Sequence, residues 1–151
     1  MEKGTLQMTS YALVTGASRN IGRAIAERLT DDGYTVLMLD KRVPEGPCPG
    51  EFRQVDLSDA AATTEALQWA LDGRNVTRLV NCAGIAPAAR VVGRDGPMPL
   101  EAFDHVIQVN LVGTFNLIRL AAVLFRRERG VIVNTASVSA FEGQILSLIH
   151  I

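Results

Sequence analysis

Residues 15–22, TGASRNIG, decide the fold because this turn joins two segments of different periodicity. Residues 11–15, YALVT, form a short apolar run that is typical of a buried strand. After the turn, Ile21, Ile25 and Leu29 recur at steps of four, which predicts a helix with one apolar face. A strand, a glycine-containing turn and a helix are therefore expected in that order.

The next residues complete a βαβ unit. Residues 31–33, DDG, are expected to stop the helix, and residues 35–39, TVLML, predict a second strand that ends on Asp40. The crossover of about twenty residues is long enough to bring the second strand parallel to the first.

Strand and helix go on alternating through the rest of the chain. Short strands are predicted at 52–55, 77–80 and 131–133, and loops at 43–50 and 87–99, which are rich in Gly and Pro. Ser58 is expected to cap a helix, and apolar residues from Phe103 to Phe125 predict a long amphipathic helix that runs from Leu100 to about Arg127. This order predicts the α/β class: a Rossmann-like, doubly wound parallel sheet of about five strands with helices on both faces.

The composition excludes several classes of protein. The 151 residues suit one domain, and 48% of them are apolar, which argues against disorder. The 15 basic and 16 acidic residues are interspersed, so no nucleic-acid partner is expected. No continuous apolar run approaches the ~18 residues of a membrane span, and no signal-peptide run is visible at the start.

The two cysteines, Cys48 and Cys82, share no spacing that is typical of a metal site or a disulfide framework. Two free thiols in a reducing compartment are therefore expected, which favours a cytoplasmic location and no metal.

Polar and small residues at the strand ends predict a nucleotide site. Ligands of such sheets bind beyond the carboxyl ends of the strands. The small residues of the 15–22 turn precede a helix N-terminus, whose unpaired N–H groups attract a pyrophosphate. Asp40, which lies 24 residues past Gly16, is placed to accept hydrogen bonds from a ribose diol. A glycine-rich turn alone can reflect tight packing, but together with Asp40 it predicts a dinucleotide site.

These residues resemble the short-chain dehydrogenases/reductases. The TGASRNIG turn is similar to that family's Thr-Gly-x-x-x-Gly-x-Gly, and residues 81–84, NCAG, are similar to its Asn-Asn-Ala-Gly element. Asn110 and Ser137 match the positions of its catalytic Asn and Ser. The resemblance covers residues 10–144, and the stretches 81–87, 110–122 and 135–144 look most like the type-2 3-hydroxyacyl-CoA dehydrogenase branch.

The resemblance implies a nicotinamide dinucleotide cofactor. Asp40 would repel the 2′-phosphate of NADP and accept hydrogen bonds from the free hydroxyls of NAD, so NAD is preferred. Arg19 and Arg42 would favour NADP if they turned inward to neutralise the phosphate. Asp56 matches the family's adenine-binding position, although it could serve only to begin the helix at Ser58. The cofactor-binding residues implied are Gly16, Ser18, Arg19, Ile21, Gly22, Asp40, Asp56, Leu57, Asn81, Cys82, Ala83 and Gly84.

Two residues depart from the family pattern. Asn20 stands where the family has a glycine, and Asn tolerates the left-handed conformation next best after Gly. Cys82 replaces the second Asn of the later element, where a small, buried hydrophobic residue is expected rather than a reactive thiol. Cofactor binding is expected to survive both changes.

The resemblance also implies how the reaction would run. Hydride transfer between an alcohol and nicotinamide needs a proton carrier and a group that holds the oxygen. The family uses a Tyr as acid/base, a Lys that lowers its pKa, Ser137 to orient the substrate oxygen and Asn110 to support a water-linked proton path. The Tyr is expected thirteen residues after Ser137, where this chain has His150.

The ending suggests why the tyrosine and lysine are missing. Residues 146–151 resemble the translation of a DNA-sequencing adapter. We therefore expect residues 145–151 to be a non-native tail on a truncated single domain, with residues 1–9 as a leader. The intact parent is expected to be an NAD-dependent oxidoreductase acting on a small hydroxy or keto compound, such as a 3-hydroxyacyl-CoA, and to form a dimer or tetramer. The fragment itself is expected to be inactive. An NADPH-dependent 3-oxoacyl reductase and a non-catalytic dinucleotide-binding sensor are the alternatives.

Overall fold

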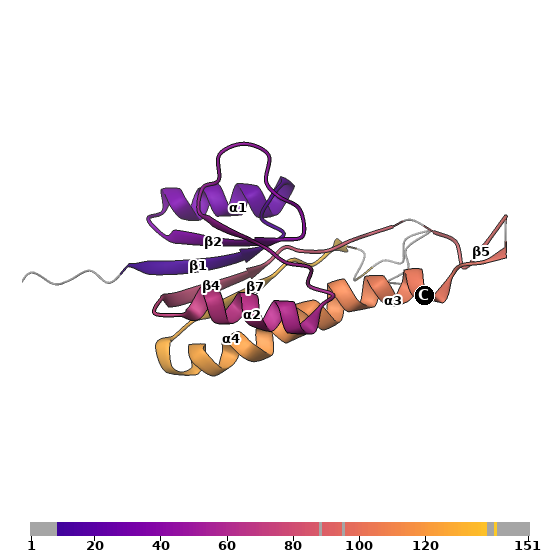
Figure 1. The fold of residues 1–151 in the computed structure, drawn as a ribbon. Helices are drawn as coiled ribbons and strands as arrows, with labels where there is room; N and C mark the ends of the chain where they lie inside the picture. The colour runs from indigo at the N-terminus through magenta and orange to yellow at the C-terminus, as the bar shows by residue number, and fades with distance from the viewer. Residues whose placement is uncertain (1–8, 88, 95, 139–140, 142–151) are drawn as a thin grey trace, which may run out of the picture.

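A computed structural model of the chain describes residues 9–87, 89–94, 96–138 and 141. Its main sheet has five parallel strands in the order β3-β2-β1-β4-β7 (Figure 1). The order runs outward in both directions from β1, which confirms the predicted doubly wound sheet. The strands are β1 (Ser10–Thr15), β2 (Thr35–Asp40), β3 (Glu51–Gln54), β4 (Asn75–Asn81) and β7 (Val131–Asn134). Residues 1–8 and 142–151 lie outside the described residues, so the structure does not test the predicted tail or most of the predicted leader.

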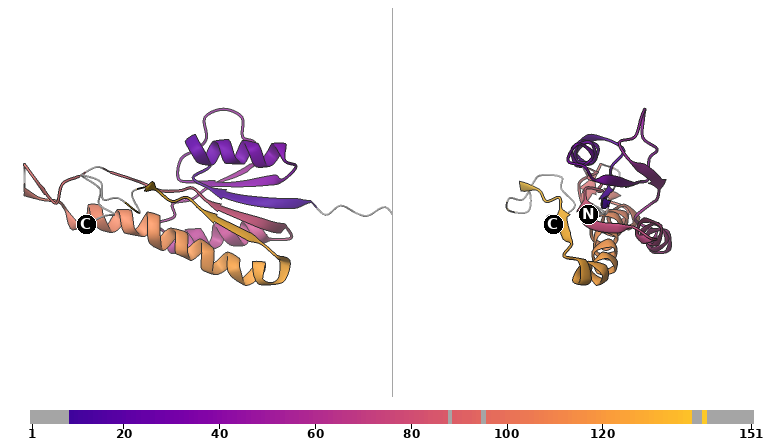
Figure 2. Two further views of the ribbon diagram at one scale, coloured as in Figure 1. Left: turned by 180° about the vertical axis from the view of Figure 1, so that it is seen from behind. Right: turned by 90° about the vertical axis from the view of Figure 1, so that its left-hand side faces the viewer.

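Helices cover both faces of this sheet. Helix α1 (Asn20–Asp31) lies on one face, and α2 (Ala60–Leu71) and α4 (Thr114–Glu128) lie on the other (Figures 1 and 2). Side chains alternate between the faces along each strand, as the pleat requires. Leu13 and its same-face neighbours pack against α2 and α4, whereas Val14 and its neighbours pack against Ala26 of α1. Burial on both faces explains why these strands read as continuous apolar runs.

Helix α1 differs from its predicted pattern at Ile21. Ile25 and Leu29 pack toward the sheet, but Ile21 is 63% exposed, so its place on the apolar face was predicted wrongly. The helix starts right after the turn at the carboxyl edge of the sheet, and Ile21 lines a cavity there. Gly22 and Ala26 are the buried residues of the helix instead.

The cap of α2 is Asp59, not Ser58 as predicted. The Asp59 carboxylate accepts hydrogen bonds from the N–H groups of Ala61 and Ala62 at 2.9 and 3.0 Å. Ser58 instead donates its N–H and its hydroxyl to Asp56 Oδ1, at 3.0 and 2.7 Å. Helix α2 begins at Ala60, so Asp59 rather than Ser58 occupies the N-cap position.

The long predicted helix contains a change of pitch. Helix α3 (Leu100–Ile107) passes into a π-helical turn, η1 (Gln108–Gly113), and then into α4. Steps of three or four along the sequence do not reveal such a turn, in which the hydrogen bond spans five residues. Before this helix, β5 (Val92–Gly93) and β6 (Gly96–Pro97) pair as a small hairpin inside the predicted 87–99 loop (Figure 1).

By length and mean hydropathy, the helical stretch Leu100–Val123 is apolar enough to cross a membrane. Core helices of globular domains meet the same criteria, and Leu117 and Ala121 on its inner side are fully buried in the core. On its outer side, Leu111, Phe115 and Val123 are each more than 60% exposed. The sequence predicts no membrane-spanning segment, because it has no continuous apolar run of sufficient length. In the stretch Leu100–Val123, polar residues such as Asn116 and Arg119 interrupt the apolar ones.

At the amino edge of the sheet, Arg74 joins residues of α2, β1 and β3, and we call this group the arginine cluster. Arg74 stacks on Trp69 of α2 at 5.2 Å and on Tyr11 of β1 at 5.9 Å. The same guanidinium donates to the Trp69 carbonyl at 2.6 Å and pairs with Glu51 of β3 at 2.8 Å. This cluster lies at the opposite edge of the sheet from the strand ends that carry the predicted site.

Candidate functional site

A cavity of about 640 Å³ opens at the carboxyl edge of the sheet. Its wall is built from the turn after β1, the segments after β2, β3 and β4, and two residues of the α3–η1 segment. Ligands of doubly wound sheets bind in this place. The lining residues are Gly16, Arg19, Asn20, Ile21, Gly22, Asp40, Lys41, Arg42, Val55, Asp56, Leu57, Cys82, Ala83, Gly84, Ile85, His105 and Val109.

The turn after β1 is packed so closely that two glycines are required. A Cβ on Gly16, whose φ is +64°, would lie 2.7 Å from the Ala83 nitrogen. A Cβ on Gly22 would lie 2.2 Å from the Gly16 carbonyl oxygen. The Thr15 hydroxyl accepts hydrogen bonds from the N–H groups of Cys82 and Ala83, both at 3.2 Å, and so ties the turn to the segment after β4. Backbone therefore forms the floor of this part of the cavity.

Asn20 begins α1 in the left-handed conformation, with φ at +51°. Asn adopts this conformation more readily than other side chains that have a Cβ. The residue that replaces the family glycine thus keeps the backbone path that a glycine would follow, and it lines the cavity.

The Asp40 carboxylate is fixed at the cavity wall by two backbone donors. Oδ2 accepts from the Ser18 N–H at 2.9 Å, and Oδ1 accepts from the Arg42 N–H at 3.0 Å. The Ser18 hydroxyl donates to the Arg42 carbonyl, which closes the loop between the two turns. A carboxylate oxygen accepts about two hydrogen bonds, so each oxygen of Asp40 retains a lone pair for a ligand hydroxyl.

Asp56, after β3, is joined to Lys41, after β2. Lys41 Nζ lies 2.6 Å from Asp56 Oδ2. Partial burial raises the pKa of Asp56, but the hydrogen bonds from Lys41 and Ser58 outweigh it and bring the pKa to about 2. The carboxylate is therefore ionised at neutral pH.

The segment after β4 meets the cavity through its backbone and through Cys82. Asn81 is buried and donates to Asn134 Oδ1 of β7 at 2.9 Å, so its side chain faces the neighbouring strand rather than the cavity. Cys82 is partly buried and packs against the cluster under α1, and its sulfur accepts from the Thr135 hydroxyl at 3.3 Å. The expected small, packed residue is thus present at Cys82, although it is not fully buried.

Asn110 and Ser137 do not line the cavity. Asn110 Oδ1 accepts from the Ile85 N–H, and its Nδ2 donates to the Ile85 carbonyl, both at 2.8 Å. This pair of bonds anchors the segment after β4 to the π turn. Ser137 is exposed and follows β7.

Of the cofactor-binding residues predicted from the sequence, the structure brings ten to the cavity wall. Ser18 and Asn81 are buried beside it, and Ser18 acts on the wall through Asp40. Sequence reasoning missed Lys41, Val55, Ile85, His105 and Val109. Lys41, Val55, Ile85 and Val109 each adjoin a predicted residue, a signal that could have found them, whereas His105 reaches the cavity only through tertiary packing. Among the described residues, no group of three or more His, Cys, Asp or Glu could hold a metal ion.

The amino-acid sequence of this chain is similar to those of known dehydrogenases. The sequence model of the short chain dehydrogenase family matches residues 10–148. The 3-hydroxyacyl-CoA dehydrogenase type-2 of Drosophila melanogaster is 41% identical over 154 aligned residues, which cover 90% of this chain and 60% of that protein. The type-2 enzyme of Bos taurus is 40% identical over 89% of this chain and 58% of its own length. The chain thus spans about three-fifths of the length of these curated relatives.

Solved structures show the same fold. The ligand-free aldohexose dehydrogenase of Thermoplasma acidophilum superposes with a TM-score of 0.82 at 28% identity, over 93% of this chain and 54% of that one. A 4-hydroxyisoleucine dehydrogenase complexed with NADH superposes with a TM-score of 0.79 at 28% identity, over 94% of this chain and 62% of that one.

Proposed function

Because the chain belongs to the short-chain dehydrogenase family, we propose that its cavity binds NAD and forms the cofactor site of a dehydrogenase for a secondary alcohol. The observation that carries the proposal is the fixed carboxylate of Asp40 at the wall of a cavity whose floor is the Gly16–Gly22 turn. At both glycines a Cβ would collide with the chain's own backbone, so they permit the tight turn and the close packing of α1 that dinucleotide-binding turns require.

Each part of the cavity has a role toward the cofactor. The N–H groups at the start of α1, which has no side-chain cap, bind the pyrophosphate. Asp40 accepts hydrogen bonds from the ribose hydroxyls, and Asp56 accepts from the base. A bound NAD would supply the acceptor for the hydride of the substrate carbon. Ser137 orients the substrate oxygen, and Asn110 supports the proton path by holding the segment at Ile85.

A 3-hydroxyacyl-CoA is the proposed substrate class. Two type-2 3-hydroxyacyl-CoA dehydrogenases are 40–41% identical to this chain, and this likeness supports the assignment. The 151 residues contain no Tyr-x-x-x-Lys element after Ser137. We therefore infer that this polypeptide by itself binds the cofactor without turning over substrate.

NADP is the competing cofactor, which would suit a 3-oxoacyl reductase. Three cations line the cavity, namely Arg19, Lys41 and Arg42, and they would favour a phosphate. Against this reading, Lys41 is paired with Asp56, and the Asp40 carboxylate would repel a 2′-phosphate. A non-catalytic dinucleotide sensor is also disfavoured, because it would have no need of Ser137.

The exposed apolar side of the long helix supports a homo-oligomer. Leu111, Phe115 and Val123 lie on its outer side. An apolar strip of this kind is a typical site for a protein partner, and we propose that a second copy of the chain covers it.

Calorimetric titration with NAD and NADP tests the cofactor proposal. We expect NAD to bind more tightly than NADP. Asp40→Ala should reduce or reverse this difference in affinity, because NAD loses an acceptor for its ribose hydroxyls and the 2′-phosphate of NADP is no longer repelled. Asp32→Ala, at the far end of α1, removes an exposed carboxylate outside the cavity and serves as the control. Equal affinity of the unsubstituted chain for both cofactors, unchanged by Asp40→Ala, would contradict the role of Asp40.

A further inference from the structure

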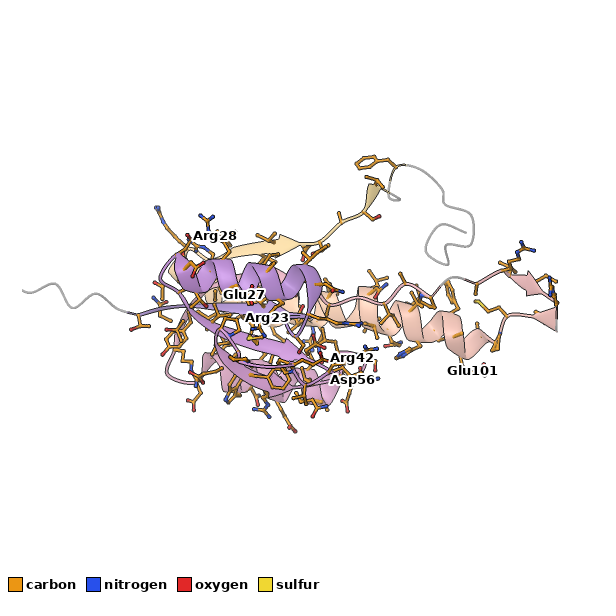
Figure 3. The ribbon with its side chains drawn as sticks, turned by 90° about the horizontal axis from the view of Figure 1, so that it is seen from above. Arg23, Glu27, Arg28, Arg42, Asp56 and Glu101 are labelled. Carbon is orange, nitrogen blue, oxygen red and sulfur yellow. The ribbon has the colours of Figure 1, made fainter. Side chains whose placement is uncertain are left out.

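The Lys41–Asp56 pair follows β2 and β3, which lie to one side of β1 and its glycine turn. Along the sheet edge, the turn follows β1, Asp40 ends β2, and Asp56 follows the edge strand β3. In Figure 3, Asp56 lies beside Arg42, between Arg28 on one side and Glu101 on the other. A dinucleotide whose pyrophosphate lies at the turn and whose ribose lies at Asp40 would therefore place its base beside Lys41 and Asp56.

The hydrogen bonds of Asp56 limit how it can meet a base. Oδ1 already accepts two hydrogen bonds, from the N–H and the hydroxyl of Ser58. Oδ2 is in contact with Lys41 Nζ at 2.6 Å and has room for one further donor. An ionised carboxylate only accepts, so a donor on the base has to share Oδ2 with Lys41.

Lys41 is held at its backbone, and its ammonium group keeps donors beyond the one that it gives to Asp56. Its carbonyl accepts a hydrogen bond from Gln54 Nε2 at 2.8 Å, which fixes the main chain beside β3. Its side chain is 64% exposed, and its ammonium group has three N–H donors, of which the ion pair uses one. The base end of the cavity thus offers an acceptor, Asp56, and a donor, Lys41, side by side.

We propose that Lys41 is a specificity-determining residue that lets the cavity bind both 6-aminopurine and 6-oxopurine dinucleotides. The inference rests on the proposed binding of NAD. Adenine would donate its 6-amino group to Asp56 and take no hydrogen bond from Lys41. Hypoxanthine has an acceptor at the same position, so its 6-oxo group would accept from Lys41. Without Lys41, the 6-oxo group loses its donor and faces a carboxylate that can only repel it.

The test compares NAD with nicotinamide hypoxanthine dinucleotide by calorimetry on the 151-residue chain. The quantity measured is the dissociation constant of the hypoxanthine nucleotide divided by that of NAD. We expect Lys41→Met to raise this ratio about five- to tenfold, as the loss of one hydrogen bond from a charged donor predicts. Lys41→Arg keeps a donor and should leave the ratio within about twofold of the starting value.

Arg28→Met is the matched control, because Arg28 also forms an exposed ion pair, with Asp32, but does not line the cavity. It should leave the ratio unchanged. Taking a ratio cancels any general loss of attraction to the pyrophosphate. A Lys41→Met ratio within twofold of the original, with both nucleotides bound, would overturn the role of Lys41 alone. Failure of the unsubstituted chain to bind either nucleotide would overturn the proposed function and this inference together.

Discussion

The side-chain amide of Asn110 forms two hydrogen bonds with the backbone of Ile85, one to its N–H and one to its carbonyl, each 2.8 Å long. In an antiparallel β ladder, the N–H and the carbonyl of one residue both bond to a residue of the neighbouring strand. Here the side-chain amide of Asn110, on the π turn, takes the place of that residue. The amide thereby holds the cavity wall at Ile85 in place.

Asn110→Ala should lower the free energy of unfolding by about 2 kcal/mol, because both backbone groups of Ile85 lose their partner in a partly buried place. Urea denaturation followed by circular dichroism measures the change. Asp104→Ala, on the exposed side of α3, should alter the unfolding free energy by less than about 0.5 kcal/mol. Equal effects of the two substitutions would show that the Asn110 bonds contribute little.

Gly22→Ala should cost about 3 kcal/mol or more, because the new Cβ would lie 2.2 Å from the Gly16 carbonyl oxygen. Gly33→Ala is the comparison: φ at Gly33 is +89°, but nothing lies within 4 Å of the added atom. It should cost only the backbone strain, about 1 kcal/mol. Thermal melts of the two variants distinguish steric overlap from strain, and a smaller loss for Gly22→Ala than for Gly33→Ala would contradict the close packing of the turn.

Asn20→Ala should lower the free energy of unfolding by about 1 kcal/mol, because alanine adopts a φ of +51° less readily than asparagine. Asn20→Gly should preserve stability or raise it by up to about 0.5 kcal/mol, since glycine takes this conformation without strain. Chemical denaturation measures the free energy of unfolding, which should decrease in the order Gly, Asn, Ala at position 20. Any other order would mean that the Asn20 side chain contributes more than its backbone preference.

Acid should weaken the fold through Asp56, whose pKa falls from 3.8 to about 2 in the folded chain. A lowered pKa means that the unfolded chain binds the proton more tightly, so this contribution is present above about pH 5 and is lost as the pH falls toward 2. The shift corresponds to about 2 kcal/mol, which solvent screening of the ion pair reduces to about 1 kcal/mol. Asp56→Asn should remove that part of the pH dependence when denaturation is measured between pH 5 and pH 2. An unchanged slope would assign the acid sensitivity to other carboxylates.

Much of the fold follows from patterns that are local in sequence. The apolar runs at β1 and β2 are buried strands because parallel strands between two helical layers need side chains of one kind on both faces. The apolar run at β7 is also a strand, but only Ile132 of its four residues is partly buried. Asp40 could be placed at the cavity because a residue that ends a parallel strand lies at the carboxyl edge whatever the details of packing.

The rest depends on which elements become neighbours. Asp56 meets Lys41 because β3 pairs with β2 in the register that sets Gln54 beside Asp40, and no spacing along the chain encodes that register. Ile21 keeps the periodicity of α1 but lies beyond the sheet, so periodicity alone assigned it to the core. Gly113, the last residue of the π turn, packs against the Leu57 carbonyl, where an added Cβ would come within 2.8 Å, and this contact joins segments far apart in the sequence.

The arginine cluster at the amino edge has a practical consequence for measuring this molecule. Trp69 is the only tryptophan of the chain, and Arg74 links it to β1 and β3 at the edge opposite the cavity. Its fluorescence should therefore report the detachment of α2 from the sheet and stay insensitive to the polarity of the nucleotide site. One intrinsic probe follows unfolding while an independent titration follows occupancy, so stability and affinity can be read in the same sample without an added label.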